Sequence, residues 1–445
     1  MDSNQQPTQL TRAWATVGRQ GAVVLEAVEL WLVELPFFHP VFTSKGAHRR
    51  RPLVLVQLIG TIDGRMVEGW GECAALADVT YDAEDVSRSF SALEHELIPA
   101  LVEQVSGDDG VLPGPADLEM AGALARRTPL AFAALEMAVA DVHLRAVGRS
   151  LADVLGVEGR TVALGAVVGT HSTSRSLVDE VSRLVADGFT RVKLKIGPGW
   201  DVDPVAAVTD HVPDLRLQVD ANGSYGEADL DHLCELDRFG LLCLEQPFDR
   251  SDLDLHRRLA ERIKTPVCLD ESLDSPGTTA SAIAMGACSV VCIKPSRLGG
   301  LGAALAVVEA CTAKGVPLWM GGMYESGFAR GVNTTLAALD GFAWPGDLSP
   351  SGTYLADDLV PGPDLTRSGA NRSLSSALPR GPGMGPAPQS EVLERRKVRH
   401  RRIEAAPARA SASHRRRDPA TMYRQVPTDR PASPEARPPN DDHRR

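Results

Sequence analysis

From residue 161 onward the chain repeats one local pattern, a short apolar strand followed by a helix-length segment. We expect strands at residues 161–169, 191–196, 215–221, 241–247, 266–272, 289–295 and 317–323. Apolar strands that alternate with helices form a parallel sheet with both faces covered. Seven or so units, spaced by roughly 25 residues, favour an α/β fold with a closed (β/α)7-8 TIM-type barrel over an open doubly wound sheet. Because no GxGxxG motif follows the first strand, a dinucleotide-binding fold is disfavoured.

The segments on either side of the barrel have different patterns. Residues 22–150 read as strands followed by helices and predict an α+β N-terminal domain packed against a barrel at 151–350. Residues 351–390 are expected to return to the N-terminal domain in an atypical form. The polar residues 1–21 and the Arg/Pro-rich residues 391–445 carry no apolar period, so we expect a disordered extension and a disordered basic tail.

Composition narrows the functional class. No apolar run reaches the roughly 18 residues of a membrane helix, and the N-terminal segment lacks the apolar stretch of a secretory signal, so we expect a cytoplasmic protein without membrane contact. The seven cysteines show no CxxC spacing, which argues against a disulfide framework or structural zinc. The net charge of -11 hides a basic tail on a more acidic body. The tail could contact nucleic acid, although most such tails are solvated appendages.

The strand VKLKI at 192–196 places Lys193 and Lys195 on one face, because side chains alternate along a strand. Two interpretations are open. The strand could lie at a sheet edge with its lysines in water, or the lysines could point into an interior that holds negative charge. The other strand ends decide between them.

Acidic residues stand at the ends of three consecutive strands: Asp220 in VDAN, Glu245 in LEQP and Asp270 in LDES. In a barrel these ends converge on one mouth. Three carboxylates there need a counter-charge, and a hard divalent cation, Mg2+ with Mn2+ or another cation as variants, fits oxygen ligands. Lys195 and Lys294 fall on either side of this row. Lysines near a cation lose their protons more readily, which equips the site to remove a proton alpha to a carboxylate.

The motifs around these residues resemble those of the enolase superfamily, and within it the o-succinylbenzoate synthase/N-acylamino acid racemase group. They are VKLKIGPGWDV, LQVDANGSY, LLCLEQPF, TPVCLDES, IKPSRLGGL, GGMYESGFARGVN and PGDLSPS, with EGWGECAAL in the N-terminal domain. The resemblance covers roughly residues 24–360. It implies an enolase-like fold in which the α+β domain caps the barrel.

The resemblance also implies roles for individual residues. Asp220, Glu245 and Asp270 match the Mg2+ ligands, Lys195 the acid/base and Lys294 the lysine on the opposite face, while Lys193 would support Lys195. Further candidates for supporting or substrate-binding roles are Asn222, Glu271, Arg297, Gly322, Met323 and Ser349. For Asn222 and Glu271 a plain hydrogen-bonding role is an equal alternative. Arg297 would either lower the pKa of Lys294 or form a surface ion pair.

Two reactions on a small carboxylate substrate follow from the resemblance. The first is dehydration of 2-succinyl-6-hydroxy-2,4-cyclohexadiene-1-carboxylate by an o-succinylbenzoate synthase of menaquinone biosynthesis, a hydro-lyase. The alternative is racemisation of N-acylamino or N-succinylamino acids. A muconate-cycloisomerase-like enzyme, a dipeptide epimerase and a non-catalytic relative that binds a partner also remain open, and a homo-oligomer is expected.

Two departures from the family pattern bear on these expectations. In HPVFTSKGAHRRR, Phe42 stands where relatives usually show an Arg, which puts substrate specificity in doubt. After Val360 the apolar strand with which relatives return to the capping domain is missing, although GPGMG at 381–385 remains.

Overall fold

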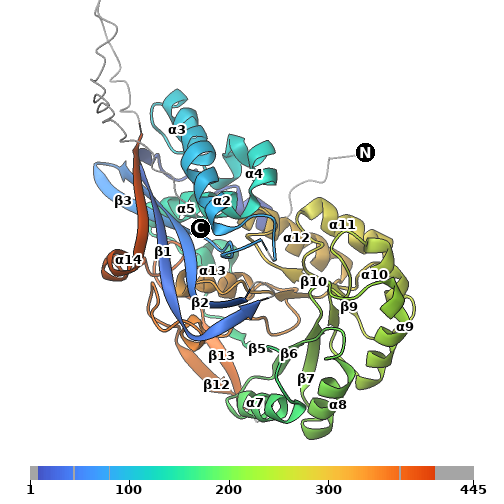
Figure 1. The fold of residues 1–445 in the computed structure, drawn as a ribbon. Helices are drawn as coiled ribbons and strands as arrows, with labels where there is room; N and C mark the ends of the chain where they lie inside the picture. Colours follow the sequence, from blue (N-terminus) through green and yellow to red (C-terminus); the bar gives the residue numbers. More distant parts are fainter. Residues whose placement is uncertain (1–8, 44–45, 80, 370–371, 406–445) are drawn as a thin grey trace, which may run out of the picture. The chain divides into compact units, whose positions relative to one another are not determined.

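The computed structural model describes residues 9–43, 46–79, 81–369 and 372–405. Its centre is a parallel sheet whose strands lie side by side in chain order (Figure 1). The strands are β5 Gly165–Val168, β6 Arg191–Lys195, β7 Arg216–Asp220, β8 Leu244–Glu245, β9 Val267–Leu269, β10 Val290–Ile293 and β11 Leu318–Met320. This arrangement confirms the predicted α/β class and the parallel sheet of the TIM-type barrel.

The eighth position of the sheet is taken by the extended segment 342–347. Phe342 bridges Leu318 at the β11 edge, and Gly346 bridges Leu164 next to β5. Backbone hydrogen bonds of 2.8 Å run from Gly165 N–H to the Gly346 carbonyl and from Asp347 N–H to the Met320 carbonyl. The sheet therefore has no free edge at this seam, because one irregular segment pairs with both of its ends.

A helix follows most strands and packs on the outside of the sheet (Figure 1). These helices are α7 Ser174–Ala186, α8 Val202–His211, α9 Leu230–Leu233, α10 Leu253–Ala260, α11 Pro276–Met285, α12 Leu301–Lys314 and α13 Gly327–Leu336. Local sequence sets their ends. In α11 the Ser275 hydroxyl accepts from Thr278 N–H and Pro276 takes the first turn, while Gly286 ends the helix with φ 74°. These are the N-cap, Pro and Gly preferences of helix termini.

The capping domain is an antiparallel sheet covered by helices. Its first strands are β1 Val24–Thr43, β2 Gly46–Ile62 and β3 Arg65–Cys73, and its helices are α2 Val86–Ala92, α3 Ile98–Gly107, α4 Ala123–Arg127 and α5 Pro129–Ala146. Asp63 (φ 51°) and Gly64 (φ 75°) make the two-residue turn between β2 and β3. A Cβ on Gly71 would lie 1.9 Å from the Ala134 carbonyl oxygen, so β3 needs glycine where α5 packs on it. α6 Leu151–Leu155 leads to the barrel.

The prediction of disorder is wrong for residues 9–21. Gln9–Trp14 form helix α1, and the Leu10 N–H donates to Glu309 Oε1 of α12 at 2.5 Å. Trp14 and Val17 are buried in the main core cluster. The polar composition hid these two apolar side chains, whose burial stabilises the segment by about 1.5–3 kcal/mol each. Residues 1–8 lie outside the described residues.

The C-terminal segment also differs from expectation. Residues 365–368 (β12) and 373–377 (β13) form a hairpin that pairs with β4 Thr161–Ala163, not with the capping sheet. The capping domain is reached later. The Met384 N–H of GPGMG donates to Asp141 Oδ1 of α5 at 2.6 Å, and β14 Lys397–Glu404 pairs antiparallel with β1 (Figure 1).

The prediction of a disordered tail from residue 391 is therefore wrong for residues 391–405, which form most of α14 Ser390–Arg396 and all of β14. A strand forms there despite its basic sequence because β1 offers unpaired backbone groups, and acidic side chains on β1 (Glu29) and in the helical segment beside it (Glu94) pair with its arginines. Arg399 and Arg401 contact Glu94 at 2.7 and 2.9 Å. The His400 ring also packs on Trp31, with centroids 3.9 Å apart. Residues 406–445 of the predicted tail lie outside the described residues. Within the described ranges, no helix has the length and apolar character needed to cross a membrane.

Candidate active site

Three carboxylates form a row at the carboxyl ends of neighbouring strands. Asp220 ends β7 and Glu245 ends β8, paired in register, and Asp270 directly follows β9. All three are almost fully buried. Burial and the charge of Asp220 raise the pKa of Glu245 to about 8, although Lys193 opposes them. Of the described buried side-chain atoms, Glu245 Oε1 is one of the few without a hydrogen-bond partner. The row thus holds one buried acceptor atom, Glu245 Oε1, that no described side chain satisfies.

The two lysines of VKLKI both point into the barrel, so the sheet-edge interpretation is wrong. Lys193 Nζ lies 3.1 Å from Asp220 Oδ2, 3.0 Å from Glu245 Oε2 and 2.7 Å from Asp347 Oδ2. Its side chain is 3% exposed, whereas that of Lys195 is 32% exposed. Lys193 is therefore an interior counter-charge, and Lys195 reaches the open side of the row.

Lys195 is held between two oxygens. Its Nζ lies 2.6 Å from Asp220 Oδ2 and 2.6 Å from Asn222 Oδ1. Burial and Lys193 both lower the pKa of Lys195, but Asp220 outweighs them, so the pKa is raised from its ordinary value. Asp220 thus opposes the loss of the Lys195 proton that the sequence predicts. A divalent cation on the same carboxylate would weaken that opposition, because like charges repel.

Lys294 stands at the other end of the row. Its Nζ donates to Asp270 Oδ2 at 2.8 Å and to the Tyr81 hydroxyl. Arg297 is buried and ion-paired with Asp270, so the alternative of a surface ion pair is wrong. Since Lys195 belongs to β6 and Lys294 follows β10, the carboxylates of β7, β8 and β9 lie between the two lysines.

The remaining candidates fall into two groups. Asn222 Nδ2 donates to Glu271 Oε1 at 2.9 Å, so this pair extends the network that begins at Lys195. The contacts of Gly322, Met323 and Ser349 are with other residues than the three carboxylates. A Cβ on Gly322 would meet Arg330 Nη1 at 2.8 Å, Met323 is buried with the capping-domain core, and Ser349 Oγ donates to the Gly165 carbonyl at 3.2 Å.

Sequence reasoning missed four residues of this network. Asp347 pairs with Lys193 and with the buried Arg191, and it lies in the PGDLSPS motif without having been singled out. Arg191 shares the inward face of Lys193 and could have been found by strand alternation. Trp319 lies under both cations, its ring centroid 4.7 Å from Lys193 Nζ. Tyr81, from a capping-domain loop, had no local signal.

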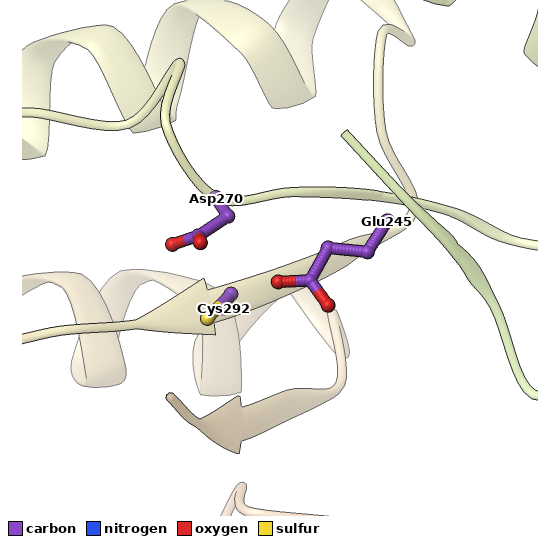
Figure 2. Close-up of side chains that lie close together, drawn as sticks. All are labelled: Glu245, Asp270 and Cys292. Atoms are coloured by element: carbon purple, nitrogen blue, oxygen red, sulfur yellow. The ribbon is translucent and has the colours of Figure 1, made fainter. Parts of the chain in front are cut away.

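Sequence reasoning also missed Cys292, which lies where a cation could bind. Among the described residues, one carboxylate oxygen each from Glu245 and Asp270 and the Cys292 sulfur all lie within 4.8 Å of one another. Figure 2 shows the Glu245 carboxylate directed toward Asp270 and Cys292, which lie one above the other in this view. Asp220 is outside this group, and its Oδ2 pairs with Lys193 and Lys195. The oxygen donors and the unpartnered Glu245 Oε1 fit a divalent cation.

Comparison with known proteins gives the same architecture. Residues 27–156 match the family described as mandelate racemase / muconate lactonizing enzyme, N-terminal domain, and residues 176–392 match the family described as enolase C-terminal domain-like. An N-succinylamino acid racemase of Amycolatopsis sp. is 41% identical over 371 residues, covering 83% of this chain and 96% of the relative. An o-succinylbenzoate synthase of Geobacillus kaustophilus is 36% identical over 364 residues, covering 82% and 93%.

A solved structure supports the fold. An enolase superfamily member from Listeria innocua aligns with a TM-score of 0.78 and 30% sequence identity, over 86% of this chain and 100% of that one.

Proposed function

This chain belongs to the enolase superfamily, and from that premise we propose that it is a divalent-cation-dependent o-succinylbenzoate synthase that also racemises N-succinylamino acids. The observation that carries the proposal is the placement of Lys195 and Lys294 at the two ends of one buried carboxylate row. Two amines that flank a substrate carbon can exchange a proton on either face of it.

The charge balance supports a carboxylate substrate. Among the described residues, the network holds five basic and six acidic side chains: Arg191, Lys193, Lys195, Lys294 and Arg297 against Asp82, Asp220, Glu245, Asp270, Glu271 and Asp347. With all of these ionised, a divalent cation leaves an excess of one positive charge. A substrate carboxylate neutralises it.

The cation would be held by Asp220, Glu245 and Asp270, and it would supply electrostatic stabilisation of the negative charge that develops on the substrate carboxylate. Lys195, the more exposed lysine, takes the proton from the carbon alpha to the substrate carboxylate. It then gives a proton to the departing hydroxyl, so that one C–H and one C–O bond break and water leaves. Lys294 remains an ammonium group and stabilises the negative charge. Lys193 stays buried and holds the carboxylates in place.

Racemisation is the second candidate, and the second lysine favours it. Lys294 would deliver a proton to the face opposite Lys195, with Arg297 beside the same Asp270. The 41% identity to an N-succinylamino acid racemase supports this activity. We place both reactions in the cytoplasm, since all seven cysteines are free thiols. We also predict that the protein forms a homo-oligomer, and light scattering of the purified protein tests this prediction.

A side-by-side assay in deuterated water with Mg2+ tests the proposal. We expect dehydration of the cyclohexadiene acid and deuterium incorporation at the alpha carbon of N-succinylamino acids, both removed by chelation. Lys195→Ala should abolish both activities, and Lys264→Ala, at an exposed lysine, should leave them unchanged. No exchange with either substrate would exclude the proposed chemistry and favour a non-catalytic relative. Racemisation without dehydration would make the racemase the main activity.

A further inference from the structure

Cys292 occupies an unusual place for a thiol in a site built for a hard cation. It lies on β10, two residues before Lys294, and strand alternation puts both side chains on the inward face. The strand runs toward the mouth of the barrel, so Cys292 lies one layer deeper than Lys294. A sulfur ligand from below would leave the positions that face the mouth to the substrate.

Close packing fixes the position of this sulfur. A Cβ on Gly321 would lie 2.7 Å from Cys292 Sγ and 2.5 Å from Lys294 Cε, so the β11 backbone presses on both side chains. The residue is 2% exposed, so its side chain is buried. Its sulfur and one oxygen each of Glu245 and Asp270 lie within 4.8 Å of one another (Figure 2). Ligand atoms bound to one cation at about 2.0–2.3 Å stand no farther apart than this.

The buried Glu245 Oε1, without a partner, is a second observation that points to a ligand here. A free carboxylate oxygen in the interior is energetically costly unless something binds it. A purely oxygen-lined site selects hard cations, while a thiolate ligand raises the affinity for softer ones. Cys292 therefore changes which cations the carboxylates favour.

We propose that Cys292 is a protein ligand, with Glu245 and Asp270, for a borderline or soft divalent cation such as Co2+, Zn2+ or Cd2+. The inference rests on the proposed function only in taking the carboxylates as cation ligands. On binding, the Sγ–H bond breaks, a sulfur–metal bond forms, and the proton leaves to solvent. The site then holds such a cation more tightly, relative to Mg2+, than the same site without the thiol.

Titration of the purified protein with Co2+ tests this by absorption spectroscopy. Visible d–d bands report cobalt binding, and a near-ultraviolet sulfur-to-cobalt charge-transfer band reports a thiolate ligand. We expect both in the wild-type protein. Cys292→Ser should keep the d–d bands, lose the charge-transfer band and lower the ratio of Cd2+ to Mg2+ affinity by about 10- to 100-fold. Cys243→Ser, at a buried thiol outside the three-atom group, should keep both bands.

The outcomes separate this inference from the proposed function. Cobalt bound with d–d bands but no charge-transfer band would overturn the inference and leave the catalytic proposal standing. A charge-transfer band that survives in Cys292→Ser, or disappears in Cys243→Ser, would also overturn it. No cobalt binding at all would contradict the cation site, and with it both this inference and the cation dependence of the proposed function. The wild-type spectrum, backed by cadmium NMR of the same protein, decides the question even where the serine variant does not fold.

Discussion

Replacing Asp347 by asparagine should lower the free energy of unfolding by about 3 kcal/mol. Asp347 Oδ2 lies 2.7 Å from Lys193 Nζ, and its Oδ1 accepts from Arg191. Both partners are buried. The neutral amide of the variant therefore leaves the ammonium group of Lys193 and the guanidinium group of Arg191 without one of their anionic partners in the interior. Removing one member of a buried ion pair costs about 3–5 kcal/mol.

The lower end of that range follows from the contacts that remain. Lys193 keeps Asp220 and Glu245 at 3.1 and 3.0 Å, and Arg191 keeps Gln218 Oε1 at 2.6 Å. Burial would raise the pKa of Asp347, but Lys193 and Arg191 outweigh it and hold the pKa below the ordinary 3.8. The stabilisation is therefore present at neutral pH and disappears only as pH falls through the folded-state value below 3.8.

Urea unfolding at pH 7, followed by far-ultraviolet circular dichroism, measures the difference. Asp340→Asn is the matched control: Asp340 pairs with Arg160 at 2.8 Å but its side chain is 88% exposed, so the expected loss is about 0–1 kcal/mol. Equal unfolding free energies for the two variants would refute the view that Asp347 is an essential interior counter-charge.

Three further changes probe the site and its support. Lys294→Arg keeps the positive charge but not a usable base, so racemisation should fall more than dehydration; equal losses in the paired assay would contradict the roles assigned to the two lysines. Gly321→Ala puts a methyl group 2.5 Å from Lys294 Cε and should lower kcat by about 100-fold. Gly352→Ala, whose added methyl group would have nothing within 4 Å, should leave kcat unchanged. Similar kcat values for the two variants would contradict the view that close packing positions Lys294. Burial raises the pKa of Glu136 from 4.5 to about 7, so its contribution to stability is complete below 4.5 and is lost as pH rises to about 7. Between those pH values the wild-type protein should lose about 3 kcal/mol of unfolding free energy that Glu136→Gln does not lose, and parallel pH profiles in urea would exclude this assignment.

Local pattern was enough to predict the barrel and the charged row. Each strand of the parallel sheet carries an apolar run, and a strand end in a barrel has one possible direction, so Asp220, Glu245 and Asp270 had to converge. The same alternation that places Lys193 inside also places Arg191 and Cys292 inside. Arg191 and Cys292 could have been predicted by counting two residues back from Lys193 and Lys294 along their strands.

Other features depend on partners that are distant in the chain. Strand β14 has no apolar period, and it forms because β1 and Glu94 lie beside it in the folded protein. Tyr81 reaches Lys294 and Arg297 only because the capping domain packs on the barrel. Propensity and periodicity act within a few residues and carry no information about such contacts.

The pairing of β14 with β1 has a consequence for the order of synthesis. The N-terminal sheet receives its last strand only after the entire barrel has left the ribosome, so the edge of β1 stays open for most of translation. An open strand edge invites pairing with other chains. The nascent protein therefore passes through a stage in which its first domain is incomplete, and a chain that stops before residue 397 keeps that edge permanently exposed.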